Sequence, residues 1–93
     1  MRSILFTVGR LEFVGSDKFM AAGRNCRDEL RCGDRLIISK GYGGEGYEAT
    51  VDEIIMYNRS VTEVEYGMTA GLFFSNGVAA QFCLGAELHA EIA

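Results

Sequence analysis

The segment from Tyr47 to Gly77 constrains the fold more than any other part of the chain. A run rich in β-branched residues, from Thr50 to Tyr57, is followed by a second apolar run, from Met68 to Phe74. Glycines stand where the backbone must turn or pack closely, at Gly67, Gly71 and Gly77. Short apolar runs bounded by glycine are typical of β-strands joined by turns. The segment therefore predicts two strands with their turns.

The remainder of the chain also has the pattern of short strands. Ile4, Phe6 and Val8 alternate with other residues, and after Gly9 the alternation resumes in the opposite phase with Leu11 and Phe13. A β-bulge at Gly9 and Arg10 explains this change, because one inserted residue bends a strand and keeps its apolar side chains on one side. Further strands are expected at 18–25, 35–39, 48–58, 68–75 and 81–90.

These patterns predict an all-β fold. No apolar repeat of period 3.6 extends over ten residues, and only the tail, 86–93, is a candidate for a helical turn. Five to seven short strands at regular spacing predict a small antiparallel β-barrel, closed or nearly closed, of about six strands. The expected core residues are Phe6, Phe19, Leu36, Ile38, Val51, Leu72 and Phe82.

Size and composition indicate one domain, 1–93. A chain of 93 residues is at the small end for a single core, and 48% of its residues are hydrophobic, enough to fold without metal or disulfide staples. The apolar run from Ile4 to Val8 is too short for a signal sequence or a membrane span. Three cysteines without a sign of secretion favour free thiols. We therefore expect a cytoplasmic protein without membrane contact.

The charges are divided unevenly along the chain. Residues 1–40 contain eight Lys or Arg against five Asp or Glu, whereas residues 41–93 contain one against eight, which gives +3 followed by −7. The net charge of −4 argues against general nucleic-acid binding, which needs a basic surface. The division is compatible with an oriented contact to a charged partner or to a second copy. The alternative is that folding mixes these charges into an ordinary solvated surface.

Several motifs recur in an order that is typical of one family. Ala22-Gly23-Arg24 is followed by a Leu-x-x-Gly-Asp motif at 30–34, and Thr50-Val51-Asp52-Glu53-Ile54 by Met56-Tyr57. The stretch from Glu65 to Leu72 then has the pattern acidic, x, Gly, x, x, apolar, Gly, Leu, and Gly85-x-x-Leu88 comes last. In this order, from about Phe6 to Leu88, the chain resembles the second, β-barrel domain of translational GTPases such as elongation factor Tu.

The resemblance implies a fold and a class of contacts. In the family the barrel packs against other domains and contacts the ribosome or aminoacyl-tRNA, whereas GTP hydrolysis belongs to a separate domain. This chain has no Gly-x-x-x-x-Gly-Lys-[Ser/Thr] sequence, so no GTPase activity is expected from it. The matched glycines are fold residues: Gly33 and Gly67 are expected at turns, and Gly71 at a close approach of strands.

One set of residues has the chemistry of a zinc site. Cys26 and Cys32 are separated by five residues, as are Cys83 and His89. Structural zinc sites usually separate paired cysteines by two to four residues, so this spacing favours free thiols and a lone surface histidine over a metal site. We expect no metal or other cofactor.

Two groups of residues are candidates for contact with a partner. The glycine-rich loop 41–46 could offer backbone amides to a phosphate, but it lacks an adjacent lysine or helix, and a mobile loop with aromatic side chains is favoured. A basic cluster is interleaved with acidic residues, and a solvated, salt-bridged turn is its alternative. The predicted partner-contact residues are Arg24, Arg27, Arg31, Arg35, Tyr42 and Tyr47.

No catalytic constellation is evident in the sequence. No nucleophile, base and orienting group occur together, which favours a non-catalytic protein-binding or adaptor module. The alternatives are an accessory translation factor that binds the ribosome or RNA, and a small enzyme that uses Cys83 and His89. A protein partner is expected, and a homodimer is a further expectation, with the loop 41–47 and the strand 68–74 as the contact surfaces.

Overall fold

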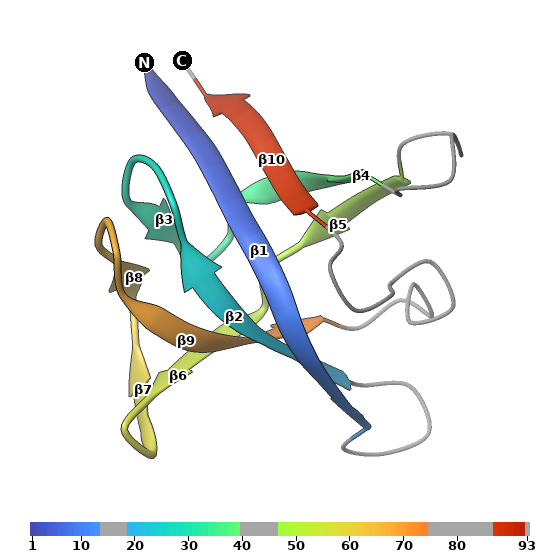
Figure 1. Cartoon of the computed structure of the whole chain (residues 1–93), viewed down its shortest axis with the longest axis vertical. Coiled ribbons are helices and arrows are strands. Elements are labelled where there is room, and N and C mark those ends of the chain that lie inside the picture. Colours follow the sequence, from blue (N-terminus) through green and yellow to red (C-terminus); the bar gives the residue numbers. More distant parts are fainter. Residues whose placement is uncertain (14–18, 40–46, 75–86, 93) are drawn as a thin grey trace.

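The computed structural model describes residues 1–13, 19–39, 47–74 and 87–92, and these residues form strands and turns (Figure 1). The strands are β1 (Arg2–Phe13), β2 (Phe19–Asn25), β3 (Leu30–Arg31), β4 (Arg35–Ser39), β5 (Tyr47–Thr50), β6 (Glu53–Met56), β7 (Arg59–Val61), β8 (Glu63–Val64), β9 (Thr69–Phe74) and β10 (Glu87–Ile92). Within the described ranges, no helix is long and apolar enough to cross a membrane.

Eight strands form one antiparallel sheet, in the order β5-β4-β10-β1-β2-β9-β6-β7. The sheet curls into a half-barrel, and β3 and β8 form a separate pair at one side of it (Figure 1). The expected all-β antiparallel architecture is confirmed, but the expected closed barrel of about six strands is wrong. The ladder of the large sheet is open between its edge strands, β5 and β7.

The β-bulge in β1 is confirmed. The register of β1 against β2 shifts between Val8 and Arg10, so Gly9 is the inserted residue. The bulge lies just beyond the part of β1 that pairs with β10, which ends at Thr7. Because a bulge increases the local twist and bends the strand, it helps the sheet to curl at the point where β1 leaves β10.

The expected strand at 48–58 is two strands with different partners. The chain changes partner at Val51, whose amide donates to the Asp34 carbonyl, and Asp52, whose amide donates to the Phe73 carbonyl. As a result β5 pairs with β4, whereas β6 pairs with β9. Residues 59–61, which lie outside the expected strands, form β7, which pairs with β6 in a hairpin.

The end of the described chain also differs from expectation. The tail 86–93 was the one candidate for a helical turn, but its described residues, 87–92, form β10 between β1 and β4, in line with the strand expected at 81–90. The alternation of Leu88 and Ala90 with exposed neighbours has the period of two that a half-buried strand requires. The first part of the strand expected at 81–90 lies outside the described residues, as do Gly77 and Gly85.

The core consists of the inward-facing residues of the curled sheet together with Leu30 and Val64 from the small one. Five predicted core residues are confirmed, with exposures of 0 or 1%: Phe6, Leu36, Ile38, Val51 and Leu72. Phe82 and the side chain of Phe19 lie outside the described part. The predicted turns at Gly33 and Gly67 are also confirmed, since φ is +93° and +81° there, where side chains other than that of glycine are strained.

Candidate binding groove

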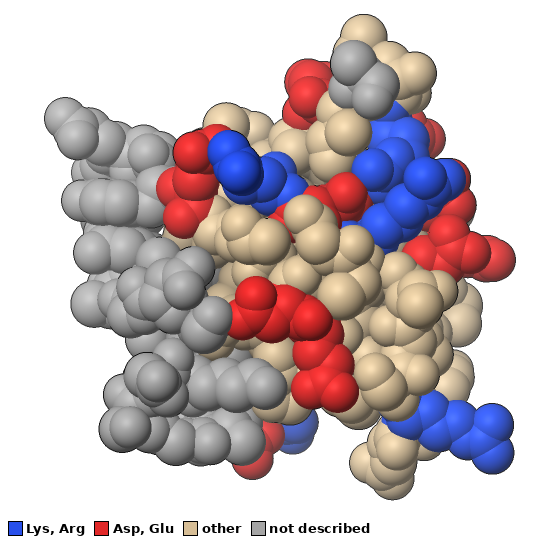
Figure 2. All heavy atoms as spheres, turned by 180° about the vertical axis from the view of Figure 1, so that it is seen from behind, with Lys and Arg blue, Asp and Glu red and all other residues tan. Residues whose placement is uncertain are grey.

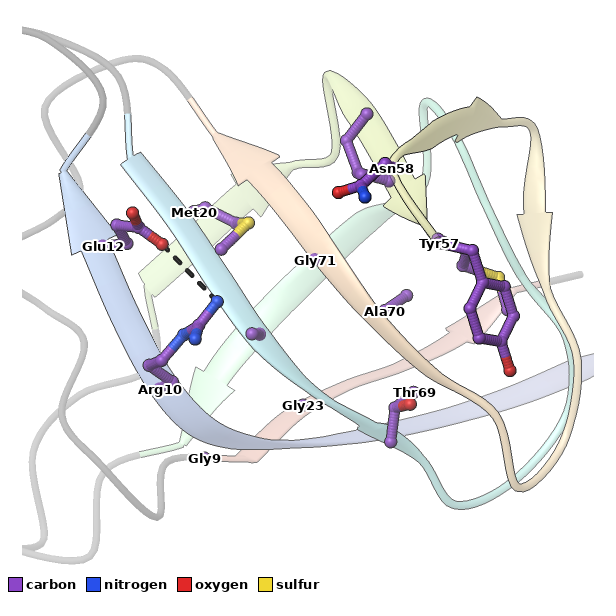
Figure 3. A pocket seen from close by; sticks show the side chains of 13 residues that line it. Gly9, Arg10, Glu12, Met20, Gly23, Tyr57, Asn58, Thr69, Ala70 and Gly71 are labelled. Carbon is purple, nitrogen blue, oxygen red and sulfur yellow. Dashed lines mark ion pairs between the residues drawn. The ribbon is translucent and has the colours of Figure 1, made fainter.

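A groove of about 650 Å³ crosses the outer face of the large sheet over β1, β2, β9 and β6 (Figure 3). Its floor follows a row of cross-strand neighbours, in which Arg10 pairs with Ala22, Ala22 with Gly71 and Gly71 with Ile55. The residues that alternate with this row point into the core. Of its two central positions, Ala22 carries only a methyl group, and Gly71 has no side chain and is covered by the Met20 thioether.

Gly71 makes room for a neighbouring side chain. A Cβ built at position 71 would collide with the sulfur of Met20, which reaches it from β2. A close approach of strands was expected at Gly71, whereas the group that approaches it is the thioether of Met20. Met20 is half-buried and lines the same groove. Because methionine is flexible, its side chain can adjust to whatever the groove receives.

One end of the groove is charged. Arg10 Nη2 lies 3.5 Å from Glu12 Oε2, and 69% and 57% of these two side chains are exposed (Figure 3). An ion pair between such exposed groups contributes little to stability, about 0 to 1 kcal/mol. Both charges therefore remain available to a molecule that enters the groove from this end.

The other end of the groove is the tip of the β6–β7 hairpin. Met56 pairs with Arg59, so Tyr57 and Asn58 form a two-residue turn, and their φ angles are +52° and +63°. Positive φ at both central residues defines a type I′ turn, which favours Asn-Gly and not an aromatic residue. Tyr57 is nevertheless 84% exposed. Its ring lies at the end of the groove opposite Arg10 (Figure 3).

Three of the four arginines predicted as a basic cluster donate hydrogen bonds to different acceptors. Arg24 Nε donates to the Gly67 carbonyl at 3.2 Å, and Arg27 Nη1 donates to Ser3 Oγ at 3.3 Å. Arg31 Nη2 donates to Glu29 Oε1 at 2.7 Å. Figure 2 shows basic and acidic side chains interleaved on one face of the molecule. The alternative of a solvated, salt-bridged turn therefore describes Arg31.

Of the remaining predicted contact residues, Arg35 is the one whose side chain is described. Arg35 is exposed on β4 and lines a second hollow of about 440 Å³ together with Ile37, Glu48 and Glu91. Tyr42 and the side chain of Tyr47 lie outside the described residues. Neither Arg35 nor the other three arginines line the groove.

A buried ion pair fastens the start of β1 to the turn between β3 and β4. Arg2 Nη1 and Nη2 donate to the two carboxylate oxygens of Asp34 at 2.8 and 2.9 Å, and the amide of Arg31 donates to Asp34 Oδ2 at 2.7 Å. Burial raises the pKa of Asp34, but the hydrogen bonds from Arg2 and from the Arg31 amide outweigh it, and the pKa lies below its ordinary value. This pair is structural and lies outside the groove.

The described cysteines do not approach a shared site. Cys26 Sγ lies 3.8 Å from Thr7 Oγ1, whereas Cys32 Sγ lies 3.1 Å from the Asp52 carbonyl oxygen. His89 is exposed on β10, and Cys83 lies outside the described residues. Within the described ranges, no three His, Cys, Asp or Glu side chains are grouped so that they could hold a metal ion.

The sequence did not indicate the groove. Ala22 and Arg10 are ordinary strand residues until β1, β2 and β9 lie side by side, so no local pattern marks them. One signal was present at the hairpin: Asn58 stands between two short β-type segments, and asparagine is favoured in two-residue turns with positive φ. That signal predicts a turn but says nothing about a groove beside it.

Comparisons with known proteins bear on the fold. No protein-family model matches the sequence, and no curated protein sequence matches it. The structure is similar to that of translation elongation factor SelB from Methanococcus maripaludis, both in the apo form and in complex with the GTP analogue GppNHp. In each case the TM-score is 0.81 and the identity 17%, over 96% of this chain and 19% of SelB. The chain thus shares its fold with part of translation elongation factor SelB, which agrees with the fold that the resemblance implied.

Proposed function

We propose that the chain is a non-catalytic binding module, which works in the cytoplasm and holds a segment of a protein partner in the groove over β1, β2, β9 and β6. The observation that supports this proposal is the groove itself, with a floor of small residues, a charged end and an aromatic end. Its volume, about 650 Å³, is within the usual range for binding sites. A low apolar floor suits an inserted side chain, and the charges at one end can orient it.

The lining argues for binding and against catalysis. Arg10, Glu12 and Tyr57 are the titratable residues that line the groove in the described part of the chain. A single exposed carboxylate already paired with an arginine does not supply a nucleophile together with a base and an orienting group. The groove therefore supports recognition of a partner, in which aromatic and arginine side chains commonly contribute most of the binding energy.

The proposed function can be tested with a substitution in the floor of the groove that fills it with a larger side chain. In Ala22→Leu the larger side chain points to the outer face, so it should block the groove without entering the core. Immobilised wild-type protein and the variant would be exposed to nuclease-treated lysate of the source cell, and retained proteins would be quantified by mass spectrometry. Thr62→Leu, at an exposed position outside the groove, is the matched control.

We expect at least one protein to be retained by wild type and by Thr62→Leu and to be reduced about tenfold or more with Ala22→Leu, as for loss of a central contact. Equal retention by the two leucine variants would overturn the groove as the binding site. A folded Ala22→Leu protein, checked by circular dichroism, is required for the comparison to count.

A role as an accessory to translation is the second candidate, and the structural similarity to SelB favours it. The probe is purified ribosomes in a co-sedimentation assay. Binding at low salt that weakens as salt is raised would support this role, because contacts with phosphates release counterions. Absence of co-sedimentation at low salt would remove it. The net charge of −4 makes a broad contact with RNA unfavourable, so any such contact should be small.

A further inference from the structure

We infer that the chain has a second binding site, at which an extended peptide segment of another protein adds its main chain between β4 and β10. This site is separate from the groove over β1, β2, β9 and β6, because it lies in another part of the sheet. It is the hollow of about 440 Å³ that Arg35 lines. The observation that carries the inference is a split in the sheet, whose two sides turn main-chain donors and acceptors toward each other.

The strands β4 and β10 part before either of them ends. Their register covers Ser39 to Ile37 on β4, and its last pair is Ile37 with His89. β4 nevertheless begins at Arg35 and β10 continues to Ile92, and the two strands lie at a wide angle to each other (Figure 1). If the register continued, Arg35 would pair with Glu91. Instead both residues line the hollow between the strands.

The main chain of Arg35 faces the hollow from the side of β4. In the preceding residue, the Asp34 carbonyl accepts from the Val51 amide at 3.0 Å, on the side of β5. The described peptide bonds are trans, and in a trans peptide the carbonyl and the following N–H point in opposite directions. The Arg35 N–H therefore points away from β5 and toward β10. Because both main-chain groups of a strand residue face the same neighbour, the Arg35 carbonyl points there too.

The main chain of Glu91 faces the hollow from the side of β10. On β1, the Ser3 carbonyl accepts from the Asp28 amide at 3.0 Å, on the side of β2. The next amide, that of Ile4, therefore points toward β10, where the register places Ala90 opposite it. The Ala90 carbonyl is thus used by β1. The Glu91 N–H, which follows it, points away from β1 and toward β4, where the register has already ended.

Donors and acceptors on both walls of a gap suit an extended main chain. Such a chain presents N–H and C=O groups to its two sides in alternation, so neighbouring residues of one segment can bond to Arg35 and to Glu91. The lining side chains agree, since they include charges of both signs, on Arg35 and on Glu48 and Glu91. A free phosphate or a cation would meet like charge on one wall, whereas a peptide unit is neutral and bipolar.

The floor of the split is already fastened. Asp34 lines the hollow, and its carboxylate accepts from both Nη atoms of Arg2 and from the Arg31 amide. Since Arg2 belongs to β1, this pair joins β1 to the start of β4 where β10 and β4 have parted. The two walls are therefore held in place before a segment enters, and a preorganised site costs less to bind.

The other strands offer less for main-chain pairing. β9 was expected to be a contact surface for a second copy, but it pairs with β2 on one side and with β6 on the other, so it has no free edge. The edge strands of the large sheet, β5 and β7, present one row of main-chain groups each. The split presents two rows, so it can bond a segment from both sides.

Short random peptides displayed on phage, selected on the immobilised full chain, are the probe. We expect enriched peptides whose binding slows hydrogen exchange at the Arg35 and Glu91 amides about tenfold or more, since both amides then gain an acceptor. The Ile37 amide, which faces His89 in the ladder, is the internal control and should exchange slowly with or without peptide. A selection without an enriched peptide, or peptides that leave both amides unprotected, would overturn the inference.

Methylated peptides distinguish the split from a free strand edge. Each enriched peptide would be resynthesised with one main-chain amide methylated at a time, which removes a donor and leaves the side chains unchanged. In the split, methylation at either of two adjacent positions should weaken binding about tenfold or more, because neighbouring residues bond to opposite walls. At an edge strand only alternate positions are sensitive, so strictly alternating sensitivity would contradict insertion between β4 and β10.

Glu91→Pro tests the wall that β10 contributes. The substitution removes an N–H that β1 does not use, and a strand tolerates proline where the N–H faces away from its neighbour. It should weaken peptide binding about tenfold or more, whereas Glu91→Ala, which keeps the N–H, should bind within about twofold of wild type. Equal binding by the two variants would overturn the inference. The exchange and methylation measurements use the unaltered chain, so they decide it even if Glu91→Pro does not fold.

The same peptides separate this inference from the proposed function of the groove. Peptides whose binding is lost in Ala22→Leu but kept in Glu91→Pro occupy the groove, and the split is then not the site. Peptides with the opposite behaviour occupy the split, and they leave the groove to be judged by its own lysate test.

Discussion

Leu72 gives the sharpest stability prediction at the scale of single residues. It is 0% exposed on β9, between the core residues that β2 and β6 contribute. Leu72→Ala should lower the free energy of unfolding by about 2 to 5 kcal/mol, because the variant loses apolar contacts and leaves a cavity. Chemical denaturation measures the change. Thr62→Ala, at an exposed position, should change it by less than about 0.5 kcal/mol, and equal effects of the two substitutions would contradict the buried position of Leu72.

Asp34 gives a prediction of pH dependence. Its pKa in the folded protein is lower than the ordinary value of 3.8, because the hydrogen bonds from Arg2 and the Arg31 amide outweigh the effect of burial. A carboxyl group with a depressed pKa stabilises the fold above its unfolded pKa, and the stabilisation is lost as the pH falls through the folded pKa. The free energy of unfolding should therefore decrease more for wild type than for Asp34→Asn over roughly pH 5 to pH 2.

The control for this measurement is Glu65→Gln, at an exposed position. Its pH profile should follow that of wild type. Parallel profiles for wild type and Asp34→Asn would show that the carboxyl group titrates alike in the folded and unfolded chains. In that case the paired geometry with Arg2 would not persist in solution.

At the scale of elements, the sequence predicted those strands and irregularities that a local alternation of apolar residues marks. The phase change after Gly9 has one simple local cause, and the bulge is present. The break between β5 and β6 was not predictable in this way, because both halves are apolar and only the tertiary fold assigns them to β4 and β9. β3 and β8 contain two residues each, too few to show a period. The groove needs four paired strands, so no single segment could indicate it.

Asn25 supports a prediction about how the small sheet is held to the large one. Its side-chain amide is 0% exposed and donates to the carbonyls of Asp28 and Val64 at 2.9 and 2.8 Å. Asn25→Ala should lower the free energy of unfolding by about 2 to 4 kcal/mol, because two hydrogen bonds are lost and two carbonyls lose their partner. Hydrogen exchange at the β8 amides should accelerate more than exchange at the β10 amides. Equal acceleration would show that Asn25 acts only on global stability.

At the scale of the whole molecule, folding interleaves the charges that are separated along the sequence. Arg31 Nε lies 3.9 Å from Glu63 Oε2, and this pair joins the basic first part of the chain to the acidic second part. Figure 2 shows side chains of both signs on the face that it draws, so the alternative of mixed charges is the better description of that face. An oriented contact must come from a local arrangement of charges and not from the overall division.

The prediction for the whole molecule is cooperative unfolding of residues 1–93 as one unit. The buried residues of both sheets form one contiguous cluster, so no element has a core of its own. Calorimetry at dilution should show one transition with equal calorimetric and van't Hoff enthalpies and a heat-capacity change of about 1.1 to 1.4 kcal/mol/K. Two resolved transitions, or a far-UV spectrum dominated by helix, would contradict this description of the molecule.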